Sequence, residues 1–200
     1  MTPGARLAAA IEVLADIGAR RRPAPDALKD WGLSHRFAGS GDRAAIAGLV
    51  YDTLRRRASA AFMMADDSPR GTALGMLVRE RQLDPDAVAR LADGSGYAPP
   101  ALTDTERAKL TAADVSGAPA HVRGDYPEWL DPHLQKVFGD ERAEEGAALA
   151  SRAPLDLRVN TLKGERDEAQ AEFADLKPAP TRWSPQGLRI VLAADAKNPA

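Results

Sequence analysis

Cysteine is absent from the 200 residues of this chain. Its absence excludes disulfide bridges, thiolate metal sites and any cysteine nucleophile. Aromatic residues make up only 5% of the sequence, so a hydrophobic core must be built mainly from Leu, Val, Ile and Ala. Apolar residues nevertheless reach 44% and charged residues 28%. This balance is typical of a folded, soluble protein and argues against disorder throughout the chain.

Long hydrophobic runs are missing as well. No uninterrupted apolar stretch approaches the ~20 residues that a membrane-spanning helix needs. The apolar segment from Leu7 to Ile17 is interrupted by Glu12 and Asp16, so the sequence predicts no signal peptide. We therefore expect a cytoplasmic protein that has no membrane partner.

The small net charge of −2 conceals an uneven distribution. From Met1 to Phe62, ten Lys and Arg residues stand against six Asp and Glu residues, a local net charge of +4, and the remainder is acidic. Two runs of three arginines, Arg20–Arg22 and Arg55–Arg57, lie in this basic part. Clustered basic side chains are typical of surfaces that contact phosphates, so this part is a candidate for nucleic-acid binding.

Capping residues and apolar stripes predict a first half that is entirely helical. Thr2-Pro3 is typical of a helix start, and a short helix is expected from Asp26 to Gly32. Asp42 is expected to cap a long helix that continues to about Met64. Three further helix starts are indicated by a capping residue followed by Pro or Glu, namely Ser68-Pro69, Asp84-Pro85, and Thr103 with Glu106. No strand is expected before Gly124.

The pattern changes in the second half. A loose stretch from Ala112 to Gly124 predicts a domain boundary there. The elements expected after it are helices over 127–138 and 140–152, a half-buried strand over Leu155–Val159, a helix over 165–176, and a hairpin with strands at 181–183 and 188–192. We therefore expect a mainly α fold, with a helical domain at residues 1–120 and linker helices leading into the beginning of a small α+β domain at residues 121–200.

The expected strand, helix and hairpin of the second half are too few to form a stable domain. Such a small set of elements buries too little apolar surface to offset its conformational entropy. We therefore expect the native protein to continue past Ala200.

Three motifs follow one another in the second half. They are Tyr126-Pro127-Glu128-Trp129-Leu130, then Phe138-Gly139, and finally Leu157-Arg158-Val159-Asn160-Thr161-Leu162-Lys163 after Pro154. In order and spacing they resemble the segment that precedes the catalytic domain in Sun/Fmu/NOP-type (RsmB-like) methyltransferases of 16S ribosomal RNA. The stretch from Asp42 to Arg55 looks like the most recognisable helix of NusB, an antitermination factor whose helical domain type these enzymes often carry.

The resemblance implies a function in which this chain has only a part. Enzymes of that family transfer a methyl group from S-adenosylmethionine to C5 of cytosine, hold the cofactor on a Gly-rich turn and attack C6 with a cysteine. This sequence has neither feature. The resemblance therefore implies the RNA-binding N-terminal region of a ribosomal RNA (cytosine-5) methyltransferase, with small-subunit ribosomal RNA as its partner. The expected S-adenosylmethionine site and catalytic domain lie beyond residue 200, so this chain itself should bind no cofactor and be inactive.

The candidate RNA-binding residues are all basic: Arg20, Arg21, Arg22, Arg36, Arg43, Arg55, Arg158 and Lys163. Arg20–Arg22 follow a helix, where cations also stabilise the negative end of the helix dipole, so a structural role stays open. Arg55–Arg57 spread over ~300° of helical arc and cannot all face one ligand. Arg158 shares a strand face with Asn160, whose alternative role is to bond the backbone of the turn at Lys163-Gly164.

Other classes of function remain open at this stage. One alternative is a stand-alone NusB-like factor that binds RNA or protein without catalytic activity. A second is a protein-interaction module with no RNA role, which the near-neutral charge permits. His35, His121 and His133 lack the spacing of metal ligands, so no metal site is expected. Trp129 is expected to anchor a helix in the core, and the oligomeric state stays open.

Overall fold

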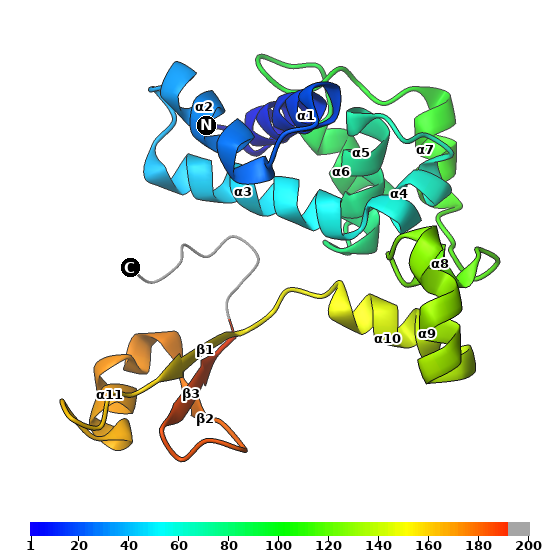
Figure 1. Ribbon diagram of the computed structural model, residues 1–200. Helices are drawn as coiled ribbons and strands as arrows, with labels where there is room; N and C mark the ends of the chain where they lie inside the picture. Colours follow the sequence, from blue (N-terminus) through cyan, green and yellow to red (C-terminus); the bar gives the residue numbers. More distant parts are fainter. Residues whose placement is uncertain (192–200) are drawn as a thin grey trace. The chain divides into compact units, whose positions relative to one another are not determined.

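The structure is a computed structural model that describes residues 1–191. The chain divides into two compact units, the first of which is Met1–Ser151 and the second of which begins at Arg152. We call them the helical unit and the sheet unit (Figure 1). The predicted fold class, mainly α with a small α+β part, is confirmed.

The helical unit contains no strand, as the sequence predicted. Its α-helices are α1 (Pro3–Arg20), α2 (Ala24–Ser34), α3 (Ser40–Arg55), α4 (Arg57–Met64), α5 (Pro69–Arg79), α6 (Pro85–Leu91), α7 (Asp104–Thr111), α8 (Ala120–Arg123), α9 (Asp131–Phe138) and α10 (Arg142–Leu149). Two short 3-10 turns, η1 (Glu128–Leu130) and η2 (Gly139–Glu141), precede α9 and α10. Within residues 1–191, no helix combines the length and the apolar character that crossing a membrane requires.

The predicted helix starts are confirmed where the capping signal is local. The Thr2 hydroxyl accepts a hydrogen bond from the Ala5 backbone N–H at 3.2 Å, so it satisfies one of the free donors at the start of α1. Ser68 and Asp84 cap α5 and α6 in the same way. Thr103 and Glu106 form the reciprocal capping box at α7.

Two details of the predicted long helix are wrong. Its N-cap is Gly39 rather than Asp42, which lies in the first turn of α3. The Asp42 carboxylate instead binds the Met1 amino group at 3.1 Å and the Arg6 Nε at 2.9 Å, so it joins the starts of α1 and α3. The helix is also interrupted at Arg56, where φ is −108° and ψ is 22°, so α3 and α4 are separate helices.

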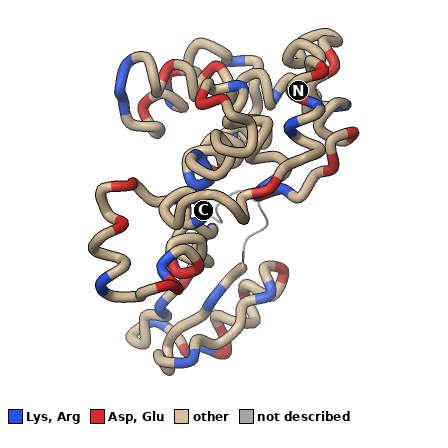
Figure 2. Tube along the Cα trace, turned by 90° about the vertical axis from the view of Figure 1, so that its right-hand side faces the viewer, with Lys and Arg blue, Asp and Glu red and all other residues tan. Residues whose placement is uncertain are grey.

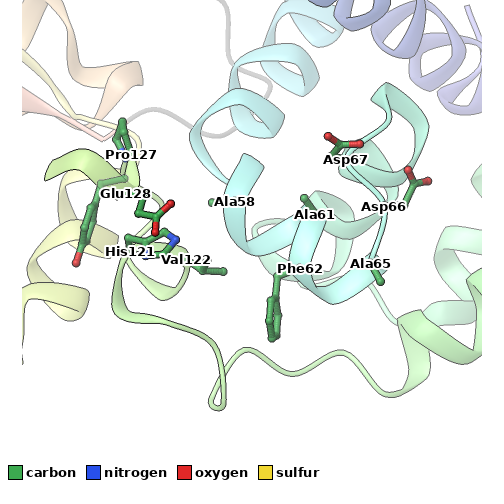
Figure 3. Close-up of a pocket in the computed structure, with 11 residues that line it drawn as sticks. Ala58, Ala61, Phe62, Ala65, Asp66, Asp67, His121, Val122, Pro127 and Glu128 are labelled. Carbon is green, nitrogen blue, oxygen red and sulfur yellow. The ribbon is translucent and has the colours of Figure 1, made fainter. Parts of the chain in front are cut away.

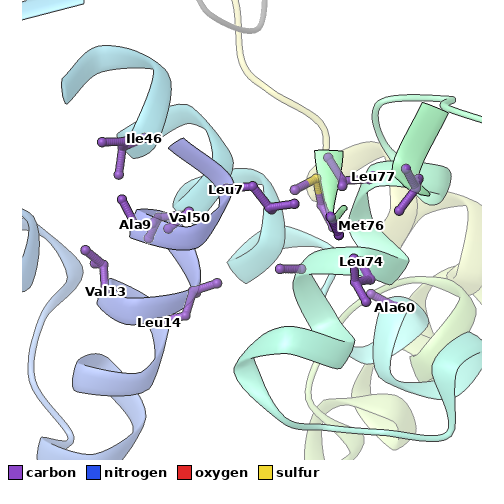
Figure 4. Close-up of a cluster of buried hydrophobic side chains, with 14 of the residues drawn as sticks. Leu7, Ala9, Val13, Leu14, Ile46, Val50, Ala60, Leu74, Met76 and Leu77 are labelled. Atoms are coloured by element: carbon purple, nitrogen blue, oxygen red, sulfur yellow. The ribbon is translucent and has the colours of Figure 1, made fainter. Parts of the chain in front are cut away.

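The core of the helical unit lies between α1, α3, α4 and α5 (Figure 4). Leu7 and Val13 of α1 are almost completely buried, as are Ile46 of α3 and Leu74 of α5. The buried Leu7, Ala10, Val13 and Leu14 of α1 recur at intervals of three or four residues, which places them on one helical face. Aliphatic residues and Ala provide most of this core, as the low aromatic content predicted.

Trp129 is a further correction. Its side chain is 71% exposed, whereas the sequence predicted a core anchor. Pro127 precedes η1, and this tight turn directs the indole outward while the neighbouring Tyr126 is buried. The Tyr126 hydroxyl donates to Asp131 Oδ1 at 2.7 Å. The buried anchor of this segment is therefore the tyrosine.

The compact helical unit extends to Ser151, past the expected domain boundary near residue 120, which stays a prediction. Helix α8 packs against α4 and α10, which keeps α8–α10 within the helical unit. Asp125 fixes this arrangement, because its buried carboxylate accepts hydrogen bonds from the Ser59 N–H and hydroxyl, both at 2.8 Å. These partners are 66 residues apart in the chain, so no local sequence signal marks the contact.

The sheet unit contains an antiparallel hairpin, as expected, and one covering helix, but the first hairpin strand is Ala179–Pro180 rather than 181–183, which lie in the connection to the second strand. Its elements are β1 (Leu155–Arg158), α11 (Arg166–Glu172), a 3-10 turn η3 (Ala174–Leu176), β2 (Ala179–Pro180) and β3 (Gly187–Ile190). The strand order is β1-β3-β2, and Leu157 pairs with Leu188. The predicted hairpin residue Leu192 lies outside the described residues.

The alternation in β1 and β3 gives the sheet one apolar and one polar face. Leu188 and Ile190 are buried on the apolar face, together with the half-buried Leu155 and Leu157 of β1. Helix α11 packs against β3 (Figure 1). The opposite face of the sheet is exposed. It carries Asp156 and Arg158 of β1 and Arg189 of β3.

Candidate nucleic-acid interface

The first arginine run lies at the end of α1, and two of its three members form ion pairs. Arg20 Nε lies 3.0 Å from Asp16 Oδ1, and an Arg22 Nη atom lies 2.6 Å from Asp30 Oδ2. The Arg22 guanidinium lowers the pKa of the Asp30 carboxyl below its ordinary value through this hydrogen bond. Arg21 adopts a left-handed conformation at the C-cap of α1, and its side chain is exposed. Ion pairs this exposed contribute little energy, so a phosphate contact by this run stays a prediction.

The predicted basic residues of the helical unit do not form one cluster. Arg43 lies next to Asp42, which is bound to Arg6 at the start of α1. Arg20 lies 14 residues after Arg6 on the same helix, about 21 Å away along the helix axis. Arg20 and Arg43 are therefore near opposite ends of α1. Arg43 also donates from Nε to the Ala38 carbonyl at 2.9 Å, which fixes the turn before α3. The exposed Arg36 lies in that turn.

The second arginine run divides between surface and interior, as the helical arc predicted. Arg55 pairs with Asp52, a buried carboxylate that also pairs with Arg81. Arg56 is directed inward and bonds Glu80 Oε2 at 2.6 Å. Arg57 is exposed. The contact of Arg55 with Asp52 gives it a structural role, whatever else it contacts.

Charges of both signs alternate along the trace of the helical unit, and Figure 2 shows blue and red segments interleaved. A hollow of about 740 Å³ lies between α4 and the segment from α8 to η1 (Figure 3). Carboxylates of Asp66, Asp67 and Glu128 line it, together with Phe62 and several alanines. No Lys or Arg is among its lining residues, so this hollow repels phosphate and is unsuited to RNA.

The polar face of the sheet unit offers a different environment. Arg158 and Asp156 project from β1 on this face, and Arg189 projects from β3 opposite Asp156. Arg189 binds Asp156 through two hydrogen bonds of 2.7 Å, which lowers the pKa of the Asp156 carboxyl. The residue opposite Arg158 on β3 is Gly187, so no side chain opposes Arg158 there. Among the described residues, Arg158 has no ion-pair partner.

The β2–β3 connection places an aromatic ring beside this face. The Arg182 guanidinium lies 4.4 Å from the centre of the Trp183 ring, a cation–π contact. The Trp183 side chain is 83% exposed, so this contact leaves its other ring face open. The loop is held by backbone hydrogen bonds of 3.0 Å from Thr181 N to Gly187 O and from Gly187 N to Ser184 O.

These side chains surround a hollow of about 560 Å³, which we call the sheet-face hollow. Its lining residues are Asp156, Leu157, Arg158, Pro180, Thr181, Arg182, Trp183, Ser184, Gly187 and Arg189. Because Asp156 neutralises one of the three arginines, the lining has a formal charge of +2. A hollow of this size and charge with an exposed aromatic ring suits an anionic ligand that has a flat apolar part.

The opposite side of the sheet unit is acidic. The segment from Glu165 to Asp175 contains five carboxylates and one arginine, Arg166. Lys163 lies at the edge of this side, in the turn before α11. The Asn160 side chain accepts from the Leu162 N–H at 3.1 Å, and the Asn160 carbonyl accepts from the Lys163 N–H at 2.8 Å. Asn160 therefore has the turn-forming role that was one of its two alternatives.

The comparisons with known proteins gave one match, which lies in the second half of the chain. Residues 126–197 match a family model described as the ferredoxin-like domain of RsmF/B-like methyltransferases. The matched range includes η1 to α10 of the helical unit and all described elements of the sheet unit from β1 onward. No curated protein matched the chain. The match covers 72 of the 200 residues and shows a likeness to this methyltransferase domain.

Of the residues on the polar face, only Arg158 was among the sequence candidates. Arg182, Trp183 and Arg189 were missed because their segment was interpreted only as a hairpin. The sequence signal for these residues was the pair Arg182-Trp183 beside a turn, together with Arg189 in the alternating strand that follows. An exposed tryptophan next to arginine at the edge of a sheet is a recurring feature of nucleic-acid-binding surfaces.

Proposed function

We propose that this chain is the RNA-binding region of an S-adenosylmethionine-dependent ribosomal RNA (cytosine-5) methyltransferase. The observation that carries the proposal is the match of residues 126–197 to the ferredoxin-like domain of RsmF/B-like methyltransferases. The polar face of the sheet unit supports it, because an exposed indole and two guanidinium groups that form no ion pair with any described residue lie within the matched range.

The division of labour follows from the chemistry of the reaction. Methylation at C5 of cytosine needs a nucleophile that adds to C6, and a thiolate supplies it in the family. This chain has no cysteine, so its own residues can position RNA but cannot form that covalent bond. In the proposed function, the thiolate and the S-adenosylmethionine site belong to a catalytic part that this sequence does not include, and the target is small-subunit ribosomal RNA in the cytoplasm.

The stand-alone alternatives are less well supported. A NusB-like antitermination factor or a protein-interaction module would account for the helical unit. Neither would account for a methyltransferase-family match that covers every described element of the sheet unit.

The experiment is a salt titration of binding between the full chain and small-subunit ribosomal RNA. Each phosphate contact should contribute about 0.7–0.9 to the slope of log affinity against log salt. The double variant Arg158→Ala, Arg182→Ala should lower this slope by about 1.4–1.8. A charge-matched control, Arg90→Ala with Arg166→Ala, removes two positive charges outside the polar face and should bind like the wild type. Absence of binding even at low salt would contradict the proposal.

A further inference from the structure

The sheet-face hollow combines three features. It has an aromatic ring that is 83% exposed, two arginines without ion-pair partners among the described residues, and at Gly187, opposite Arg158, a position that carries no side chain. A single exposed tryptophan would need no explanation, because apolar atoms make up much of any protein surface. The presence of all three features on one side of a three-stranded sheet does require an explanation.

We infer that the sheet-face hollow binds an unpaired nucleotide of single-stranded RNA, with its base stacked on Trp183 and its phosphates held by Arg158 and Arg182. The inference rests on the proposed function, because it names the kind of RNA that the polar face takes. It goes further in assigning a binding site, its ligand class and the residues responsible.

The stacking surface is already prepared in the free protein. Arg182 lies 4.4 Å from the centre of the Trp183 ring, so the guanidinium covers one ring face and leaves the other for a base. A base of any identity has a π-face, so the site accepts different bases with modest selectivity. A base within a duplex is already stacked on both sides and is not free to occupy this ring face.

The phosphate-binding groups lie along the same surface. Arg158 projects from β1 at the position opposite Gly187, and both residues line the hollow. Gly187 is required there, because a Cβ atom at this position would lie 2.0 Å from Thr181 Oγ1. The Thr181 hydroxyl is itself fixed by donating to the Ser184 carbonyl at 3.2 Å. The loop that holds the ring and the floor that exposes Arg158 are therefore parts of one rigid arrangement.

Charge selects RNA over a protein segment as the occupant. The two arginines without ion pairs attract an anion, while Arg189 is occupied by Asp156 through two hydrogen bonds of 2.7 Å. An acidic peptide would satisfy the charge but would leave the aromatic face without a flat partner. A nucleotide satisfies both requirements at once.

The test measures binding of the full chain to two probes, a single-stranded RNA of about eight nucleotides and an RNA duplex of the same length. Trp183→Ala should weaken binding of the single strand about five- to 150-fold, the range measured for loss of one stacked base. Trp183→Phe should restore most of that loss. Trp129→Ala, which removes another exposed tryptophan, should bind as the wild type does. Duplex binding should be the same for Trp183→Ala and the wild type.

A spectroscopic measurement separates stacking from a merely structural role. In a Trp129→Phe background the remaining tryptophans are the buried Trp31 and the exposed Trp183. Single-stranded RNA should quench the Trp183 fluorescence at the same concentrations that give binding. Circular dichroism of Trp183→Ala should match the wild type, because the ring lies outside the core.

The outcomes distinguish this inference from the proposed function. Equal affinity of Trp183→Ala and wild type for the single strand would overturn the inference, as would an equal loss for single strand and duplex. If the wild type binds ribosomal RNA but not the short single strand, the inference fails and the proposed function stands. If it binds neither RNA, both fail.

Discussion

Arg56 is the residue whose removal should most disturb the helical unit. Its side chain is 10% exposed and its Nε donates to Glu80 Oε2 at 2.6 Å. One Nη atom donates to the Ala147 carbonyl at 3.2 Å and lies 3.7 Å from the fully buried Asp125 carboxylate. A single guanidinium thus connects the start of α4, the end of α5 and α10.

The cost of Arg56→Ala can be bounded from these contacts. Breaking a buried ion pair by removing one partner costs about 3–5 kcal/mol, because the other charge stays buried without compensation. Asp125 keeps two hydrogen bonds from Ser59, and the Glu80 side chain is 21% exposed, so the lower end of the range applies. We expect a loss of about 3 kcal/mol, equivalent to a fall of roughly 6–12 °C in the melting temperature of a domain of this size.

The loss should depend on pH in a defined direction. Burial raises the pKa of the Asp125 carboxyl above its ordinary value, while hydrogen bonds from Ser59 and the charges of Arg56 and Arg79 act against this rise. Because the folded-state pKa is raised, the cost of the buried charge is present above that pKa and disappears as the pH falls through it. The destabilisation of Arg56→Ala should therefore be largest at neutral pH and smaller in mild acid.

Urea unfolding followed by far-ultraviolet circular dichroism measures this loss. Arg57→Ala is the matched control, since the neighbouring arginine is exposed and its removal should change stability by no more than about 0.5 kcal/mol. Equal unfolding midpoints for the two variants, or a loss for Arg56→Ala that grows in acid, would refute the reasoning.

Three further outcomes follow from the structure. Burial and the hydrogen bond to Asp131 raise the pKa of Tyr126 to about 12. Its neutral form therefore stabilises the fold up to pH ~10, and this stabilisation is lost as the pH rises through the raised pKa. An ultraviolet titration should show a late phase that Tyr126→Phe removes. Three tyrosines titrating together near pH ~10 would contradict this. Gly187→Ala should destabilise the sheet unit by about 1–3 kcal/mol through the clash with Thr181. Hydrogen exchange should then show faster exchange of the backbone amides of β3. Unchanged exchange rates would contradict the close approach of Thr181 to Gly187. Calorimetry should detect no saturable binding of S-adenosylmethionine to the chain, and a measurable heat of specific binding would reverse that expectation.

The parts of the fold that the sequence predicted are those governed by neighbours in the chain. Thr2, Ser68 and Asp84 cap helices because the N–H groups that they satisfy are three residues away. The strand at Leu155 was visible because alternation depends only on successive side chains. Local geometry of this kind does not require knowledge of the tertiary structure.

The misplaced details depend on distant partners. Asp42 was expected to cap a helix, yet the Met1 amino group and Arg6 are its partners, and both belong to another helix. Nothing in three consecutive arginines indicates that Arg56 is the buried one, because Glu80 and Asp125 lie 24 and 69 positions away.

The candidate site was predicted only in part. Arg158 was identified because it lies in a motif and on an alternating strand, whereas Trp183 gave no periodic signal. The sheet-face hollow exists only once the register places Gly187 opposite Arg158 and the loop turns the ring toward the same face. Sequence reasoning also favoured the basic N-terminal half, where the structure instead distributes the arginines among carboxylates.

In the proposed function, this chain serves the methylation of cytosine in small-subunit ribosomal RNA. Bisulfite sequencing of that RNA, from cells with and without the gene that encodes the chain, tests it most directly. We expect a 5-methylcytosine that is present in the first sample to be missing from the second and to return when the gene is restored. Identical 5-methylcytosine profiles in the two samples would contradict it.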